Sequence, residues 1–288
     1  MCIFVQLTEQ ELIHSHLVPL RRSGTRPLLF CLPGVGDDNA RGFLEMVDAL
    51  PKDQPVYGFR WPTMDGTTDL FSVEQLAELY LADIRRIQKT GPYYLCGQSL
   101  GGLIAYEIAT LLVSAGEEVG LLALFDADNP ALAANLSQRD YFRFRGKYVQ
   151  DRLRKYYQNI RRGKVRDIMS DALRFFRGRL TTAFGIAVRA AFRIANRPMP
   201  KLMRSRVFTF TAAWYAYNPK EYPRTLVLFR AQDRRAEHQD DETLGWKMCV
   251  TGPIEVHLAP GDHVTIMQSP HVQGLAETLC RYLGEPSP

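Results

Sequence analysis

Residues 93–103, Tyr-Tyr-Leu-Cys-Gly-Gln-Ser-Leu-Gly-Gly-Leu, decide the fold of this chain of 288 residues. An apolar run ends at Gly97, and a stretch with helix-forming composition continues from position 103 to Ala115. This pattern predicts a buried strand that turns sharply into a helix. The glycines at 97 and 101 suit such a turn, because larger side chains would collide with the neighbouring strand and helix. Ser99, in the middle of the turn, would project its hydroxyl above the carboxyl edge of the sheet, so it is the candidate nucleophile.

The sequence on both sides of this motif alternates between short apolar runs and helical periodicity. The apolar runs predict strands at 27–32, 56–59, 93–96, 119–125, 225–229 and 254–258. Helical spacing predicts helices at 42–50, 73–90, 103–115, 241–248 and 272–283. Strands that are apolar throughout need cover on both faces. The fold class is therefore α/β, with a mostly parallel central sheet and helices on both faces.

One long segment, residues 131–216, interrupts this alternation. Helical spacing of aromatic and aliphatic residues, with Arg and Lys between them, predicts amphipathic helices there. The sequence thus divides into an α/β core, residues 1–130 and 217–288, and a helical lid insertion. A composition that is 46% apolar and 23% charged excludes a disordered, collagen-like or disulfide-dense chain.

Charge is distributed very unevenly along the chain. Residues 139–206 hold 20 Lys and Arg but four Asp, a net charge of +16, whereas the rest of the chain totals −11. Three roles fit this basic segment: an ordinary solvated face, a surface that steers an acidic partner protein, or contact with anionic lipid. Nucleic acid is not an expected partner, because no binding module accompanies the charge.

Other features of the sequence exclude several classes of protein. The five cysteines form no CxxC pair, and there is no phosphate loop, GxGxxG motif, HExxH motif or zinc ligand set, so no metal or nucleotide cofactor is expected. The first residues lack the basic stretch of a signal peptide, and no apolar run reaches the length needed to span a bilayer. We therefore expect a cytoplasmic protein.

A serine nucleophile needs a base, and six histidines compete for that role. Two precede the first strand, His14 and His16, and three others lie in a charged loop, inside a strand pattern and at the start of the last helix, namely His238, His257 and His271. His263 alone follows a strand end, where a loop can reach back over the edge of the sheet. We therefore predict His263 as the general base.

Three aspartates are candidates for the acid that orients the base. Asp126 is the first residue after the strand 119–125, which places it at the sheet edge beside the strand of Ser99. Asp128 suits a cap of the following turn, and Asp233 follows the strand 225–229. The position directly after the strand favours Asp126 as the acid, and Asp128 and Asp233 remain alternatives.

The tetrahedral intermediate of acyl transfer needs two backbone N–H donors for its oxyanion. The first is predicted at Leu100, directly after the nucleophile. The second is predicted in the turn after the first apolar strand, at Val35, with Gly34 as the next choice.

In combination, these stretches resemble the thioesterase domains that release products from polyketide and nonribosomal peptide synthases, within the wider α/β-hydrolase superfamily. The matching residues are 17–24, 26–34, 91–109, 115–119, 124–126, 260–267 and 270–272. The resemblance implies an α/β-hydrolase fold and supports Asp126 over Asp233. It also implies that Ser99 takes an acyl group from a phosphopantetheine thioester on a carrier protein, after which water or an internal nucleophile releases the chain.

The resemblance also suggests how the substrate is presented and held. An acyl or peptidyl carrier protein would dock near the basic segment 139–206 and deliver a small-molecule acyl substrate, with no cofactor resident in this chain. The carrier would come from another chain or from sequence outside this one, since no attachment motif is present. Gly34, Gln98 and Tyr148 are the predicted substrate-binding residues. Gln98 departs from the family, in which an aromatic residue or histidine more often stands at this position.

Three other functions are compatible with the same residues. An acyltransferase would use the same triad to pass the acyl group to an amine or alcohol. A lipid or ester hydrolase would use the amphipathic insertion at a membrane surface. A non-catalytic binding protein with this fold would not need the three residues of the triad.

Overall fold

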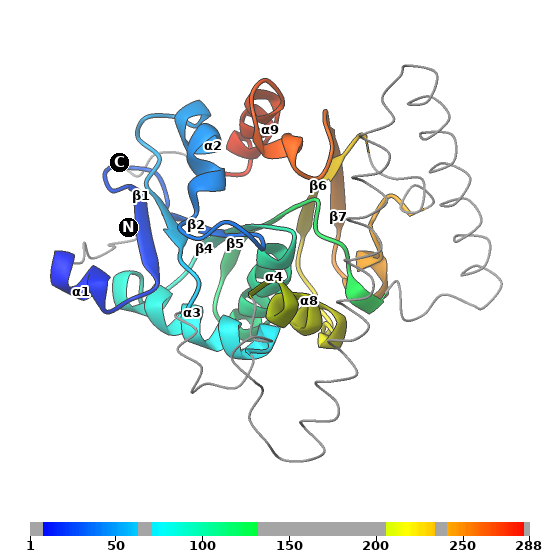
Figure 1. Ribbon diagram of the computed structural model, residues 1–288, viewed down its shortest axis with the longest axis horizontal. Helices are drawn as coiled ribbons and strands as arrows, with labels where there is room; N and C mark the ends of the chain where they lie inside the picture. Colours follow the sequence, from blue (N-terminus) through cyan, green and yellow to red (C-terminus); the bar gives the residue numbers. More distant parts are fainter. Residues whose placement is uncertain (1–7, 63–70, 132–205, 234–240, 285–288) are drawn as a thin grey trace, which may run out of the picture.

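The computed structural model describes residues 8–62, 71–131, 206–233 and 241–284, and within them a seven-stranded sheet forms the centre of the molecule (Figure 1). Its strands are β1 (Leu17–Arg21), β2 (Leu29–Leu32), β3 (Val56–Phe59), β4 (Tyr93–Gln98), β5 (Val119–Phe125), β6 (Leu226–Ala231) and β7 (Ile254–Ala259). They lie in the order β1-β3-β2-β4-β5-β6-β7. β1 pairs antiparallel with β3, and all other neighbours pair in parallel. The predicted mostly parallel sheet is confirmed.

Helices cover both faces of this sheet, as predicted. The helices are α1 (Glu9–Ile13), α2 (Leu44–Ala49), α3 (Val73–Ile87), α4 (Leu100–Ser114), α8 (Arg206–Ala216) and α9 (His271–Cys280). Buried residues of α3, α4 and α8 share one hydrophobic cluster with the sheet, and those of α2 and α9 share another. Figure 1 shows α2 and α9 above the strands and α3, α4 and α8 below them.

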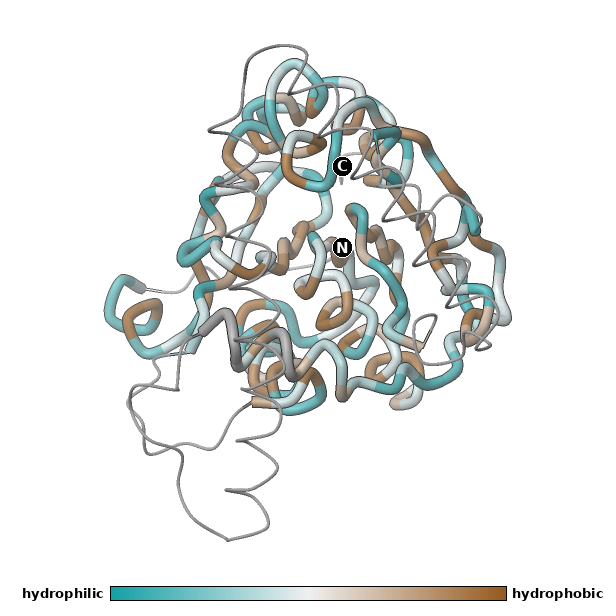
Figure 2. Tube along the Cα trace, turned by 45° about the vertical axis from the view of Figure 1, so that its right-hand side comes forward, coloured by the Kyte–Doolittle hydropathy of each residue, from teal (hydrophilic) through white to brown (hydrophobic). Residues whose placement is uncertain are grey.

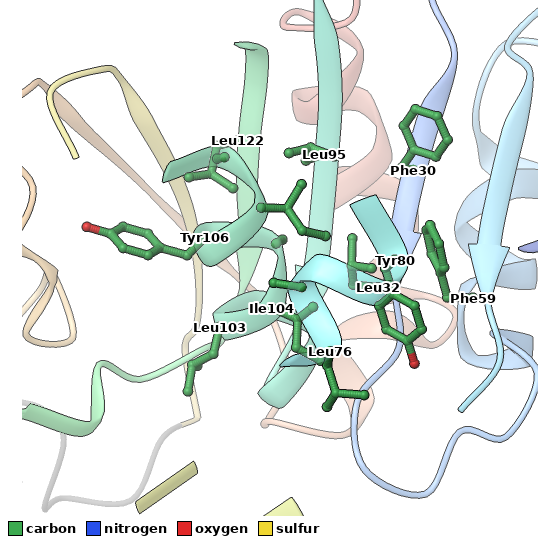
Figure 3. Close-up of a cluster of buried hydrophobic side chains, with 14 of the residues drawn as sticks. Phe30, Leu32, Phe59, Leu76, Tyr80, Leu95, Leu103, Ile104, Tyr106 and Leu122 are labelled. Atoms are coloured by element: carbon green, nitrogen blue, oxygen red, sulfur yellow. The ribbon is translucent and has the colours of Figure 1, made fainter. Parts of the chain in front are cut away.

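Successive side chains along a strand point to opposite faces of the sheet, so the strands contribute residues to both hydrophobic clusters. In β4, Tyr93 and Leu95 point to the face of α3 and α4, whereas Cys96 points to the face of α2 and α9. Figure 3 shows the first cluster, which contains strand residues such as Leu95 together with Leu76 of α3 and Ile104 of α4. Figure 2 shows hydrophobic and hydrophilic stretches along the chain; α3 has one buried face, whereas α4 is buried on nearly all sides.

Two predicted elements begin or form differently from the expectation. The helix after Ser99 starts at Leu100 rather than at 103. The predicted helix 241–248 is wrong: turns lead to a 3-10 helix at Trp246–Met248. Leu244 and Gly245 have positive φ values of 52° and 84°, which a right-handed helix does not admit. The Asp241 carboxylate stabilises the turn by accepting the backbone N–H groups of Thr243 and Gly245.

Most of the predicted insertion, residues 132–205, lies outside the described residues, and with it Tyr148 and nearly all of the basic segment 139–206. The predicted domain boundaries therefore stay predictions. The described end of the insertion is α8, which packs on the core through Phe210 and Ala213, and the ring of Phe210 lies 4.0 Å from that of Trp61. No helix among the described residues is long and apolar enough to cross a membrane.

Candidate active site

Ser99 occupies a strained turn between β4 and α4. Its backbone has φ 52° and ψ −120°, a conformation that L residues rarely adopt and that is found at functional turns. The turn is tight enough to require both glycines: a Cβ on Gly97 would lie 2.3 Å from the oxygen of Gly101, and one on Gly101 would lie 2.1 Å from the oxygen of Leu32. The backbone N–H of Ser99 donates to the oxygen of Phe125, 3.2 Å away. The structure therefore confirms the strand–turn–helix geometry predicted from residues 93–103.

Asp126 and His263 are joined directly. Asp126 Oδ2 lies 2.8 Å from His263 Nδ1, and Asp126 Oδ1 accepts the backbone N–H of Ala231 at 2.9 Å. The Asp126 side chain is fully buried, whereas half of the His263 side chain is exposed. A buried carboxylate thus fixes an imidazole whose other face is open to the surface. Because the bond uses Nδ1, Nε2 is the nitrogen that can take a proton from a nucleophile.

Ser99 and His263 both line a cavity of about 510 Å³. The residues around it come from the loop after β2, the start of α2, the end of β4 and the loop after β7. They are Gly34, Val35, Gly36, Asp37, Arg41, Gly42, Glu45, Gln98, Ser99, His263, Val264, Met267 and Gln268. Five residues predicted for the site therefore share one cavity, namely Ser99, His263, Gly34, Val35 and Gln98.

The two predicted oxyanion donors lie on either side of the nucleophile. Leu100 is the first residue of α4, where backbone N–H groups have no intrahelical partner and the helix dipole favours negative charge. Val35 lies in the loop after β2, and its neighbour Gly34 contacts the turn closely: a Cβ on Gly34 would lie 3.3 Å from the oxygen of Gln98 and 3.7 Å from Cβ of Ser99. This loop therefore lies directly against the nucleophile turn.

The alternative acids and bases differ from Asp126 and His263 in their surroundings. Asp128 is half-buried, and Asp233 is exposed, with its backbone N–H bonded to the oxygen of Gly261. His16 pairs with Asp83 and His257 with Tyr282, both away from the cavity. His238 falls outside the described residues, His14 is exposed, and His271 begins α9. Of the candidates weighed, the structure brings Asp126 and His263 together.

Sequence reasoning missed two roles in the His263 loop, that of Asp262 and that of Gln98, which it predicted only as a substrate-binding residue. Asp262 accepts hydrogen bonds through Oδ1 from the backbone N–H groups of Val264 and Thr265, at 3.0 and 2.8 Å. The backbone and side-chain hydrogen bonds from Thr265 lower the pKa of the Asp262 carboxyl. The Asp262-x-x-Thr265 spacing is a turn signal that identifies this role. The second residue is Gln98, whose Nε2 donates to the main-chain oxygen of His263 at 3.2 Å, a bond that no sequence spacing reveals.

The described residues contain no group of three or more His, Cys, Asp or Glu side chains that could hold a metal ion. The cavity itself is lined by a serine and by a histidine whose imidazole is held by a buried carboxylate.

Comparison with curated proteins finds similar sequences in large biosynthetic enzymes. The chain is 28% identical over 276 residues to the probable non-canonical nonribosomal peptide synthetase CymA of Salinispora arenicola (strain CNS-205), an alignment that covers 93% of this chain and 3% of that protein. It is 44% identical over 116 residues to malpibaldin synthetase of Mortierella alpina, covering 40% of this chain and 2% of the synthetase. The chain therefore spans only a small part of these relatives.

Solved structures of low sequence identity share the fold. A four-domain nonribosomal peptide synthetase, holo-AB3403, superposes with a TM-score of 0.63 at 23% identity, over 97% of this chain and 21% of that one. The Vlm2 thioesterase domain superposes with a TM-score of 0.57 at 19% identity, over 93% of this chain and 98% of that one. The sheet and its helices therefore form the α/β-hydrolase fold found in thioesterase domains.

A family model described as "Thioesterase domain" matches residues 27–283, which include every part of the cavity described above. The match extends across β2 to α9 and so covers nearly the whole sheet. The chain belongs to the thioesterase domain family.

Proposed function

We propose that this chain is a serine thioesterase that releases an acyl, polyketide or peptidyl chain from a phosphopantetheinyl carrier protein through an acyl-Ser99 intermediate. The observation that carries the proposal is the 2.8 Å bond between Asp126 and His263 at a cavity that also contains Ser99 in its strained turn. This arrangement combines a nucleophile, a base and an orienting acid, the three roles that acyl transfer by a serine hydroxyl needs.

The first half-reaction forms the acyl-enzyme. Ser99 Oγ attacks the thioester carbonyl while His263 Nε2 takes its proton, and a tetrahedral oxyanion results. The carbonyl then re-forms, the C–S bond breaks, and His263 returns the proton to the departing phosphopantetheine thiol. In the second half-reaction His263 deprotonates water or a hydroxyl or amine, which attacks the Ser99 ester. The bond between the acyl carbon and Ser99 Oγ then breaks, His263 returns the proton to Oγ, and the product is released.

The other residues act on the charges that develop during these steps. Asp126 holds the imidazole in the required tautomer and stabilises it when it is protonated. The backbone N–H groups of Leu100 and Val35 would stabilise the oxyanion, and each donor of this kind contributes about 3 kcal/mol to lowering the barrier. Gly34 and Gln98 line the cavity with Ser99, where the thioester carbonyl of the substrate would lie.

The carrier protein enters the proposal through the relatives. Synthetases such as CymA contain the sequence that this chain resembles as a small part of a much longer protein. In such a setting the substrate arrives on the phosphopantetheine arm of a carrier, and this chain needs no cofactor of its own. The basic segment 139–206, with a net charge of +16, suits the docking of an acidic carrier.

The proposal is tested by following the acyl group. Wild-type protein incubated with an acyl-pantetheine thioester should gain the acyl mass at Ser99, and a fluorophosphonate probe should label the same residue. Ser99→Ala should show neither adduct and no turnover. Ser269→Ala serves as the matched control, because Ser269 is exposed and lies outside the cavity lining. Turnover by Ser99→Ala at the wild-type rate would overturn the proposal, and product masses with added amines or alcohols distinguish hydrolysis from transfer.

A further inference from the structure

Gln98 lies between the two loops that flank Ser99. It is the last residue of β4 and lines the cavity. On one side its Nε2 donates to the main-chain oxygen of His263 at 3.2 Å. On the other side a Cβ on Gly34 would lie 3.7 Å from its Oε1. The carboxamide thus bonds the loop of the predicted base and lies beside the loop of the predicted oxyanion donor.

The loop that carries His263 depends on polar bonds for its position near the cavity. Asp262 orders the loop from within by accepting backbone N–H groups of the next turn. Packing anchors the turn that follows, since Ile266 and Met267 are buried, but it contributes little at residues 263 and 264 themselves, because the His263 side chain is half exposed and Val264 is 61% exposed. Bonds to the rest of the molecule therefore determine where the imidazole stands.

Two of those bonds hold His263 at two different points. Asp126 holds the ring through Nδ1, and Gln98 holds the main chain through the carbonyl oxygen. The bond to Nδ1 restrains the ring, whereas the bond from Gln98 restrains the main chain. Gln98 also immediately precedes Ser99, so its bond ties the base to the residue beside the nucleophile.

We propose that Gln98 is a positioning residue for the general base: its carboxamide fixes the main chain of His263, and so its imidazole, at a set distance from Ser99. The inference rests on the proposed function, because it concerns the same base and nucleophile. A displacement of about 1 Å in a catalytic group can reduce the rate about 100-fold. The loss of one hydrogen bond that positions His263 can therefore change the rate measurably.

The chemistry of the bond defines the informative substitutions. The His263 carbonyl can only accept, so residue 98 must supply a donor, and a carboxamide does so without adding charge beside the imidazole. Gln98→Met keeps the length of the side chain and removes the donor. Gln98→Glu keeps the shape but faces the carbonyl with a carboxylate, which accepts and cannot donate until it is protonated.

The experiment compares steady-state hydrolysis of a small acyl thioester by Gln98→Met and by Gln273→Met. Gln273 is an exposed glutamine of α9 that bonds only its neighbour Ser269 among the described residues and lies outside the cavity lining. Gln98→Met should lower kcat about 10-fold or more with KM within about twofold, whereas Gln273→Met should leave both unchanged. Rates are normalised to the number of sites that a fluorophosphonate labels, so that inactive protein does not contribute.

A pH series with Gln98→Glu gives a second, independent readout. Its rate relative to that of Gln98→Met should rise as the pH falls toward about 4.3, the ordinary pKa of a glutamate, because the protonated carboxyl can donate to the His263 carbonyl. If Gln98 has a purely structural role, the ratio of the Gln98→Glu rate to the Gln98→Met rate should not change with pH.

Either of two results would overturn the inference: an unchanged kcat in Gln98→Met, or a loss confined to KM. If Gln98→Met does not fold, the pH dependence of Gln98→Glu relative to wild type decides, and a constant ratio counts against the inference. Failure of the proposed function would look different, because Ser99→Ala would then remain active. A fully active Gln98→Met beside an inactive Ser99→Ala removes only the role of Gln98.

Discussion

The carboxylate of Asp126 binds His263 with one oxygen and the backbone of β6 with the other. Oδ2 lies 2.8 Å from His263 Nδ1, and Oδ1 accepts the N–H of Ala231 at 2.9 Å. The backbone N–H of Asp126 in turn donates to the oxygen of Phe229, also in β6, at 2.7 Å. The acid is therefore fixed to the sheet by two backbone bonds, and the imidazole is fixed to the acid.

This arrangement predicts a large loss of activity for Asp126→Asn. Asparagine keeps the shape of the side chain but cannot stabilise a protonated imidazole, and it favours the wrong tautomer, so kcat/KM should fall by about 10³–10⁴. Asp233→Asn is the matched control and should stay within about threefold of wild type, because Asp233 is exposed and bonds Gly261 only through its backbone. The reverse order of effects would assign the acid to Asp233 instead.

The nucleophile turn could be predicted from the sequence because its constraints are local. Gly97, Ser99 and Gly101 lie within five residues, and the close contact between Gly97 and Gly101 follows from the turn itself. The strands were predictable for a similar reason: residues buried on both faces give continuous apolar runs. Asp126 and His263 could be placed at the sheet edge because each directly follows a strand.

Features that depend on distant partners could not be predicted. The bond from Gln98 to His263 joins two loops far apart in the sequence and depends on one side-chain conformation. Residues 241–248 have helical spacing, but the turn held by Asp241 and the burial of Trp246 against Ala127 override it. β1 contains Pro19, which argues against a strand in the sequence, and it lies at the edge of the sheet, where a strand tolerates proline.

Two glycines provide a matched test of how tightly the turn is packed. A Cβ on Gly101 would lie 2.1 Å from the oxygen of Leu32 and 2.7 Å from that of Pro33, both backbone atoms that cannot move independently. Gly101→Ala should therefore lower the free energy of unfolding by about 1–3 kcal/mol or more. Gly274→Ala, in α9 with open space around it, should raise it by about 0.5–1 kcal/mol.

Urea unfolding of the two variants beside wild type measures both effects. If Gly101→Ala raised the free energy of unfolding as much as Gly274→Ala does, the space around Gly101 would adapt to a methyl group. In that case the contact with β2 would not explain why a glycine stands at this position.

A buried aspartate away from the active site should make stability depend on pH. Burial opposes ionisation of Asp83, but hydrogen bonds from the His16 side chain and backbone N–H outweigh it and lower the pKa of the carboxyl. A lowered pKa means that the contribution is complete above the unfolded value, about 3.9, and is lost as the pH falls through the folded value. Asp83→Asn should therefore cost about 1–3 kcal/mol at pH 7 and progressively less below pH 4.

Urea unfolding between pH 7 and pH 3 checks this dependence. Asp48→Asn, at an exposed position of α2, is the control and should change the free energy of unfolding by less than about 0.5 kcal/mol throughout. A cost for Asp83→Asn that is the same at pH 7 and pH 3 would contradict the assigned role of the ionised carboxylate.

The basic segment predicts a difference between carrier-bound and free substrates. If residues 139–206 steer an acidic carrier to the cavity, reversing several Arg and Lys charges between 143 and 166 should slow turnover of a carrier-bound acyl group. The same variant should hydrolyse a small acyl-pantetheine thioester at a rate close to that of wild type, because this substrate carries no protein surface. The wild-type advantage on the carrier substrate should also shrink as salt is raised, since screening weakens attraction between exposed charges. Equal losses of turnover on both substrates would exclude carrier docking. If the wild type binds anionic vesicles and the charge-reversed variant does not, the basic segment would instead be assigned to a lipid surface.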